Sequence, residues 1–244
     1  MREPVKRALA RLGRTTPGQH VVFAATGGDR GSGRFGDASW PRRAASFEDL
    51  DFLFTSGQLN HGIASLRFDE AALLFRLARS LGPATIVELG RFKGGSTFLL
   101  AVAMAPGSEL WSYDLHLEVP AGATGEELDS ELGAALQRYG LAGVHLVVAD
   151  TRTVEQPSPE LDLLFIDADH RYEGVRADFE RWGTRVRPGG HVLFHDAVDD
   201  GGWGTGYPGV RRLVEEVTRA GGQFRRAEGA GTIAHFVRQE ASSA

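Results

Sequence analysis

From Pro83 onward, short apolar runs alternate with longer segments whose apolar residues recur at helical spacing. The apolar runs predict five strands. Their expected bounds are Thr85–Glu88, Glu109–Asp114, Val144–Ala149, Leu161–Asp167 and Gly190–His195. The segments between them predict helices near Gly95–Met104, Gly125–Tyr139 and Tyr172–Arg185. Strands and helices that alternate in this way are typical of a mostly parallel sheet with helices on both faces.

The segments that flank this alternation complete the expected fold. The stretch "DEAALLFRLARSLG" before Pro83 predicts a helix, and "GVRRLVEEVTRAGG" after Pro208 predicts an amphipathic helix that ends at glycines. "GQFRRAE" and "GTIAHFVR" then predict a closing antiparallel hairpin. We therefore expect an α/β, Rossmann-like, doubly wound sheet of seven mostly parallel strands. Residues from Thr15 to Ser46, rich in Gly, Arg and Ser, predict a mobile lid or a partly disordered arm, with a simple loop as the alternative.

Composition narrows the classes of function. The chain has no cysteine, which excludes disulfides, thiolate zinc sites and a cysteine nucleophile and agrees with a cytoplasmic location. Its formal net charge of −5 argues against nucleic acid as the main partner. No apolar run reaches the roughly 18 residues of a membrane span, and the basic N-terminus lacks the apolar core of a signal peptide. We expect a cytoplasmic protein without membrane contact.

A glycine-rich loop joins the first predicted strand to its helix in "VELGRFKGGSTFLLA". Loops of this kind bring backbone close to a ligand. The order of residues does not match the G-x-G-x-x-G of dinucleotide-binding loops. Glu88, which stands two residues before Gly90, would also repel a pyrophosphate. An acid at this place suits a ligand that carries an ammonium group and a sulfonium.

Two further acids end the next two predicted strands. Asp114 lies where an acid can accept hydrogen bonds from ribose hydroxyls, and Asp150 lies where an acid can accept one from an adenine amino group. Each acid alone could instead cap the helix that follows it. Together with Glu88 they predict a ligand at the carboxyl edge of the sheet, where open α/β sheets bind ligands.

These segments, together with "LLFIDADHRYEGVRADFERWGTRVRPGGHVLFHD", resemble the class I S-adenosylmethionine-dependent methyltransferases. More narrowly, they are similar to the metal-dependent O-methyltransferases that act on small molecules such as antibiotic sugars and macrolides. The resemblance covers the chain from about Phe68, so it implies an S-adenosylmethionine-binding domain over 68–240, preceded by an arm and lid segment over 1–67. The cofactor-binding residues that it implies are Glu88, Gly90, Phe92, Gly94, Ser96, Asp114, Asp150 and Asp167.

Acids and histidines also end the fourth and fifth predicted strands, at Asp167 and at His195 and Asp196. Buried acids side by side call for a positive charge, and a divalent metal, Mg²⁺ or Mn²⁺, would supply it. The resemblance implies that Asp167, His195 and Asp196 hold this metal, although related enzymes carry an acid where His195 stands. A histidine ligand shifts the preference from Mg²⁺ toward Mn²⁺, Fe²⁺ or Zn²⁺. Alternatively His195 shuttles a proton, or no metal binds and Asp167 bonds loop amides and the cofactor.

The general base is expected in "DADH", where the resemblance implies either of two residues. His170 is our first choice because its ordinary pKa suits proton abstraction near neutral pH, and Asp169 is the competing candidate. The alternative is that both residues cap the helix that begins at Tyr172. In the loop after Asp196, Trp203 and Tyr207 are candidates either to stack on a ring of the acceptor or to anchor the loop.

The residues and the resemblance together predict an O-methyltransferase that acts on a small hydroxylated molecule, such as the sugar or polyketide part of a secondary metabolite. The resemblance also implies a homo-oligomer. A nicotinamide-dependent oxidoreductase and a non-catalytic module that binds a nucleoside are the alternatives. The missing G-x-G-x-x-G and the acid at Glu88 count against the first, and the acids at the strand ends count against the second.

Overall fold

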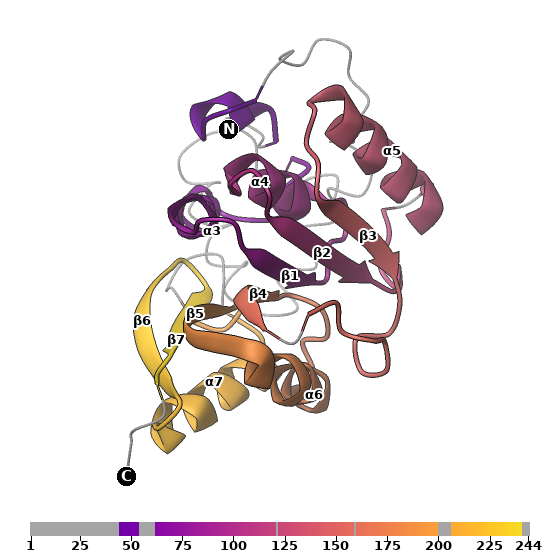
Figure 1. Ribbon diagram of the computed structural model, residues 1–244. Helices are drawn as coiled ribbons and strands as arrows, with labels where there is room; N and C mark the ends of the chain where they lie inside the picture. The colour runs from indigo at the N-terminus through magenta and orange to yellow at the C-terminus, as the bar shows by residue number, and fades with distance from the viewer. Residues whose placement is uncertain (1–43, 54–61, 121, 159, 200–205, 241–244) are drawn as a thin grey trace, which may run out of the picture.

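The computed structural model describes residues 44–53, 62–120, 122–158, 160–199 and 206–240. Its central feature is a seven-stranded sheet in the order β3-β2-β1-β4-β5-β7-β6 (Figure 1). The strands are β1 Thr85–Leu89, β2 Glu109–Asp114, β3 Val144–Val148, β4 Leu161–Ile166, β5 Val186–Phe194, β6 Phe224–Ala230 and β7 Ile233–Arg238. Strands β1 to β5 pair in parallel, whereas β7 is antiparallel to both β5 and β6. The expected mostly parallel sheet with a closing hairpin is confirmed.

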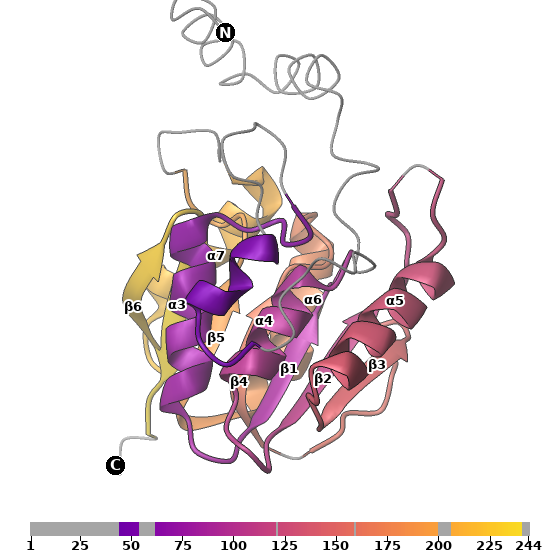
Figure 2. The ribbon, with the colours of Figure 1, turned by 90° about the horizontal axis from the view of Figure 1, so that it is seen from above.

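Helices cover both faces of this sheet. The helices are η1 Glu48–Leu53, α3 Phe68–Ser80, α4 Gly95–Ala103, α5 Gly125–Arg138, α6 Tyr172–Trp182, η2 Gly183–Arg185 and α7 Pro208–Ala220, where η denotes a 3-10 helix. Figure 2 shows α3, α4 and α5 over one face and α6 and α7 behind the other. None of the helices in these described ranges is both long and apolar enough to cross a membrane.

The core consists of two apolar clusters, one on each side of the sheet. Alternation along β1 divides its side chains between them, with Ile86 in the cluster beneath α3, α4 and α5, and Val87 and Leu89 in the cluster above α6 and α7. Trp182, at the end of α6, is fully buried in the second cluster. A central parallel strand is buried on both faces, which explains why β1 and β4 are mostly apolar.

The order of the strands places the two halves of the chain side by side at the centre of the sheet. From β1 the chain proceeds outward to β2 and β3, then returns to β4 on the other side of β1 and proceeds to β5. Ligands in such sheets bind at the carboxyl edge where this direction reverses. The two halves approach closely there, because a Cβ on Gly90 would lie 2.2 Å from the carbonyl oxygen of Asp167. Only glycine fits at this position.

Two expected boundaries differ from the observed ones by more than one residue. Strand β5 begins at Val186, four residues early, and its pairing with β4 shifts register between Leu161 and Leu163. The helix expected to reach Arg185 stays α-helical only to Trp182, and its last turn tightens into η2. Most of the predicted arm and lid over 1–67 lies outside the described residues, so that prediction stays open.

Candidate active site

The glycine loop after β1 wraps around the carboxylate of Asp114. Gly90, Phe92 and Gly94 all have positive φ, of 88°, 49° and 83°. The backbone amides of Arg91 and Phe92 donate hydrogen bonds of 2.8 and 2.9 Å to Asp114 Oδ2. Phe92 is one of three described non-glycine residues with positive φ, and all three follow strands of the parallel sheet at its carboxyl edge. Strained backbone of this kind concentrates at functional sites.

Glu88 lies fully buried beneath this loop. Its Oε2 accepts hydrogen bonds of 2.5 Å from the hydroxyls of Thr97 and Ser112, and Ser96, in the first turn of α4, lies beside it. Burial raises the pKa of Glu88 by more than these hydroxyls lower it. Its Oε1 is buried and finds no well-placed hydrogen-bond donor among the described residues. A buried oxygen without a donor is costly, and a cofactor ammonium group would satisfy it.

A buried arginine holds the loop in place. The Arg91 guanidinium, with 0% of its side chain exposed, donates two hydrogen bonds to Asp129 of α5, at 2.7 and 2.5 Å, and one of 2.9 Å to the carbonyl of Ser112. Asp114 Oδ1 accepts a hydrogen bond of 2.6 Å from the amide of His116. The carboxylate expected to meet the ribose therefore also orders the loop, a contribution that the sequence did not reveal.

Asp150 follows β3 at the same edge, as expected from the sequence. Its carboxylate forms a bidentate ion pair with Arg152, at 2.9 and 2.6 Å. The hydrogen bonds with Arg152 lower the pKa of Asp150 to about 2. The expected contacts of Asp114 with ribose and of Asp150 with adenine stay predictions.

The acids and histidines that end β4 and β5 come together beside the loop. His195 Nδ1 lies 3.0 Å and His170 Nε2 lies 3.3 Å from the same oxygen, Asp167 Oδ1. His170 Nε2 is also 3.6 Å from Asp196 Oδ2. Burial would lower the pKa of His170, but its hydrogen bond to Asp167 and the negative charge of that residue raise it. The structure thus joins four of the five predicted residues into one cluster.

Asp169 is the exception. Its carboxylate pairs with the exposed guanidinium of Arg171, at 3.0 and 2.6 Å, and this hydrogen bonding lowers its pKa. A carboxylate held ionised by arginine is a poorer proton acceptor than a histidine. Of the two candidate bases, the geometry favours His170.

His195 bridges two carboxylates, one of which the sequence did not indicate. Its Nδ1 faces Asp167, and its Nε2 lies 3.2 Å from Glu70 Oε2 of α3. Burial would lower the pKa of His195, but the charge and hydrogen bond of Asp167, aided by Glu70, raise it well above its usual value. A ligating nitrogen must carry no proton, so metal binding by His195 would need one ring nitrogen to lose its proton, and the ligand role stays a prediction.

The described residues hold one group of three side chains suited to a metal, and it differs from the predicted group. Asp167, His170 and Asp196 each offer a ligand atom, and these atoms lie within 4.8 Å of one another. Burial raises the pKa of Asp196, His195 opposes this, and the nearby Asp167 carboxylate adds to it. Two carboxylates and an imidazole this close together are a ligand set that suits a divalent cation.

Tyr207 covers one side of this cluster. Its ring stacks on that of His170, with centroids 4.2 Å apart and planes inclined by 15°, and its amide donates a hydrogen bond of 2.8 Å to the carbonyl of Asp196. The side chain is half exposed. It is therefore both tied to the Asp196 backbone and partly exposed beside His170. Trp203 lies outside the described residues.

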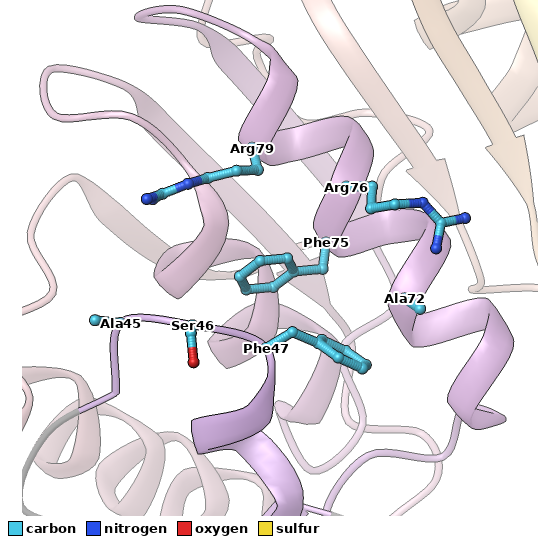
Figure 3. A pocket seen from close by; sticks show the side chains of 7 residues that line it. All are labelled: Ala45, Ser46, Phe47, Ala72, Phe75, Arg76 and Arg79. Atoms are coloured by element: carbon cyan, nitrogen blue, oxygen red, sulfur yellow. The ribbon is translucent and has the colours of Figure 1, made fainter.

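A separate surface groove of about 390 Å³ lies between residues 45–47, which precede η1, and α3 (Figure 3). The rings of Phe47 and Phe75 face it, and Arg76 and Arg79 stand on α3 along it. Its lining contains none of the strand-end residues described above. The groove is therefore distinct from the cluster at the carboxyl edge.

Comparisons with known proteins agree with this geometry. A family model described as a methyltransferase domain matches residues 87–197, which run from β1 to just beyond Asp196. The uncharacterized protein y4gI of Sinorhizobium fredii is 35% identical over 138 residues, which cover 52% of this chain and 15% of that protein. The chain thus spans much less than two thirds of the length of this curated relative.

Solved structures share the fold at low sequence identity. The O-methyltransferase TomG of Streptomyces achromogenes, in complex with SAM, has a TM-score of 0.55 and 21% identity, and the match covers 72% of this chain and 82% of that one. An O-methyltransferase of Bacillus cereus, in complex with SAH, has a TM-score of 0.54 and 20% identity, with 71% and 83% covered. The family match and the shared fold confirm the predicted resemblance to the class I S-adenosylmethionine-dependent methyltransferases.

Proposed function

We propose that the protein is an S-adenosylmethionine-dependent O-methyltransferase that acts on a hydroxyl group of a small molecule. The observation that carries this proposal is that His170 is hydrogen-bonded to Asp167 beside the glycine-rich loop. A Cβ on Gly90 of that loop would touch the backbone of Asp167, so loop and base are immediate neighbours. Methyl transfer to oxygen needs both of these parts.

We expect the loop and the strand ends to bind different parts of the cofactor. Glu88 and the loop residues Gly90, Phe92, Gly94 and Ser96 receive the methionine part, with the free Oε1 of Glu88 available to the ammonium group. Asp114 receives the ribose and Asp150 the adenine amino group, at the ends of β2 and β3. The carboxyl edge of the sheet then holds the methyl group next to the β4 and β5 cluster.

The chemistry explains why a base is needed. A sulfonium is a good leaving group, whereas a hydroxyl is a poor nucleophile until its proton is removed. The imidazole of His170 takes that proton as the acceptor oxygen attacks the methyl carbon, and the carbon–sulfur bond breaks to leave a neutral thioether. Because Asp167 raises the pKa of His170, the imidazole must first lose its own proton. Turnover should therefore rise with pH.

We further propose that Asp167 and Asp196 hold a divalent cation, Mg²⁺ or Mn²⁺, with His170 Nε2 close enough to complete the set. Such a cation supplies positive charge that lowers the pKa of the acceptor hydroxyl. Mn²⁺ titration of a His170→Ala variant separates the two roles of the ring. A ligand role predicts weaker Mn²⁺ binding in the variant, and a role as base alone predicts unchanged binding with lost turnover.

The acceptor that we propose is a sugar or polyketide-type hydroxyl compound, and Tyr207 would pack against it. Its half-exposed ring beside His170 supports this choice. We also propose that the protein is a homo-oligomer and lies in the cytoplasm, which gel filtration and cell fractionation can check. The main test is mass-spectrometric detection of a product heavier by one methylene across a panel of catechol, sugar and polyketide acceptors. Methylation on nitrogen alone, or none with any acceptor, would contradict the proposal.

A further inference from the structure

We propose that Glu70 of α3 is a positioning residue for the transfer site. It orients His195, and through His195 it fixes the Asp167 oxygen that contacts His170. For its activity readout this inference rests on the proposed O-methyl transfer, but its structural readout does not. Glu70 is 1% exposed and lies 125 residues before His195 in the chain.

Four hydrogen-bond donors converge on the Glu70 carboxylate. Oε1 accepts from the amide and the hydroxyl of Thr232, at 2.7 and 2.8 Å, and Oε2 accepts from the amide of Arg67 and from His195 Nε2, at 2.7 and 3.2 Å. A glutamine would place an NH₂ group against donors in either orientation, so only a carboxylate satisfies all four. Room for it comes from Gly231 (φ 52°), where a Cβ would lie 2.4 Å from Oε1.

These contacts set the orientation of the His195 ring. With Nε2 directed at Glu70, Nδ1 must face Asp167 Oδ1, at 3.0 Å. The same oxygen accepts from His170 Nε2 at 3.3 Å. A rotated or displaced His195 would therefore move the oxygen against which His170 is aligned. The arrangement follows the general pattern in which an outer carboxylate orients an imidazole that supports an inner ligand or base.

A second role for Glu70 is plainly structural, and a test must separate the two. By accepting from the amide of Arg67, Glu70 completes a capping box at the start of α3. Loss of a cap lowers stability by the same amount whether or not His195 is present. Loss of positioning affects turnover, and only when His195 is there to be positioned.

The experiment is a double-mutant cycle with Glu70→Gln, His195→Gln and the double variant. For each protein, kcat is measured with the best acceptor found, S-adenosylhomocysteine affinity by calorimetry, and stability by urea unfolding. We expect Glu70→Gln to lower kcat about tenfold with S-adenosylhomocysteine affinity almost unchanged, and to have less than about a twofold effect on kcat in the His195→Gln background. An equal loss of kcat in both backgrounds would overturn the proposal.

The matched control is Asp162→Asn at the opposite edge of the sheet. Asp162 accepts a hydrogen bond of 2.7 Å from the Thr85 amide and pairs with Arg187, so the same carboxylate-to-amide change removes comparable contacts far from the cluster. It should lower stability and leave kcat unchanged. If Glu70→Gln does not fold, Glu70→Asp replaces it, because this variant keeps both acceptor oxygens on a shorter side chain.

If the wild-type protein methylates none of the acceptors, the proposed function fails and the positioning role is still testable. The His195 Nε2 proton is then followed by nitrogen-edited NMR in wild type, Glu70→Gln and Asp162→Asn. We expect a slowly exchanging ring proton that is lost only in Glu70→Gln, together with non-additive unfolding energies for Glu70 and His195. A ring signal unchanged by Glu70→Gln, or additive unfolding energies, would contradict the role.

Discussion

The two halves of the carboxyl edge neutralise their carboxylates by different means. In the half formed by β1, β2 and β3, most partners are arginines and backbone amides, as in Asp129 with Arg91, Asp150 with Arg152 and Asp114 with the loop, and His116 also lies 3.0 Å from Asp129. In the half formed by β4 and β5, histidines contact each of the clustered carboxylates, whereas Asp169 outside the cluster pairs with Arg171. The contacts there are Asp167 with His170 and His195, Asp196 with His170 and His195, and Glu70 with His195.

This difference separates a half whose charges are mainly fixed by arginines from a half in which histidines make the charge adjustable. A guanidinium stays charged at every pH at which the protein is folded, whereas an imidazole changes charge near neutral pH. The first half is therefore suited to hold a cofactor in one geometry. The half formed by β4 and β5 is suited to take up and release a proton. It is also suited to bind a cation when its imidazoles lose their protons. Cofactor binding and methyl transfer should accordingly respond differently to the same perturbations.

The largest expected effect comes from removing the proposed base. His170→Ala should lower turnover by about 10²–10⁴-fold while leaving S-adenosylhomocysteine affinity nearly unchanged. Single-turnover kinetics and calorimetry on the same preparation measure the two quantities. Asp169→Asn serves as the control, since its carboxylate is committed to Arg171. A large loss of turnover in Asp169→Asn, together with full turnover in His170→Ala, would make Asp169 the base instead of His170.

Removal of divalent cations should have the next largest effect, again confined to the second half. Treatment with a chelator is expected to lower turnover by about 10–100-fold, with recovery on addition of Mg²⁺ or Mn²⁺. The reason is that the proposed cation between Asp167 and Asp196 is removed. Nucleoside affinity, measured before and after chelation, should stay constant. Full turnover in the chelated protein would contradict the proposed role of the cation.

In the half formed by β1, β2 and β3, the sharpest perturbation is a substitution of the buried Arg91. Arg91→Lys keeps the charge but loses the fork that joins Asp129 to the Ser112 carbonyl, so about 1–3 kcal/mol of stability and part of the nucleoside affinity should be lost. The control is Arg176→Lys in the exposed pair with Glu180, where a change below about 0.5 kcal/mol is expected. Urea unfolding and calorimetry measure both variants. Equal effects of the two substitutions would contradict a special role for Arg91.

The smallest effect concerns pH. The raised pKa of His170 means that the ring is protonated, and inactive as a base, until the pH exceeds its ordinary value of 6.5. Turnover should rise with pH through that raised pKa, while nucleoside affinity stays flat over the same range. A pH profile of kcat beside one of affinity makes the comparison. A turnover that falls as the pH rises from 6 to 8 would contradict the assignment.

Stability should depend on pH through Glu70, in the acid range. Burial alone would raise the pKa of Glu70, but the hydrogen bond and charge of His195 lower it to about 2 from 4.5. A carboxyl whose folded pKa lies below its unfolded value stabilises the protein above the unfolded pKa. Its contribution is therefore complete above about pH 4.5 and is lost as the pH falls toward 2. Acid unfolding of wild type and Glu70→Gln should show a smaller loss in the variant.

The parts of the site that the sequence predicted are those that follow strands directly. Asp167 and Asp196 end apolar runs, and a parallel sheet brings such ends to one edge. Glu70 and Thr232 meet across 162 residues, and each looks ordinary in its own segment, one as a helix cap and the other as a turn residue. The contact of His195 with Glu70 escaped prediction for the same reason, because this second carboxylate comes from a distant helix. The place of β7 between β5 and β6 was likewise not apparent from chain order.

The most direct test of the central claim is calorimetric titration of S-adenosylhomocysteine into wild-type protein and His170→Ala. Each titration is run with and without Mn²⁺, at pH 6 and pH 8, and turnover is measured under the same conditions. The account predicts similar nucleoside affinity in all of these titrations, with turnover restricted to wild type and highest with Mn²⁺ at pH 8. Absence of nucleoside binding to wild-type protein, or equal turnover in the two proteins, would contradict it.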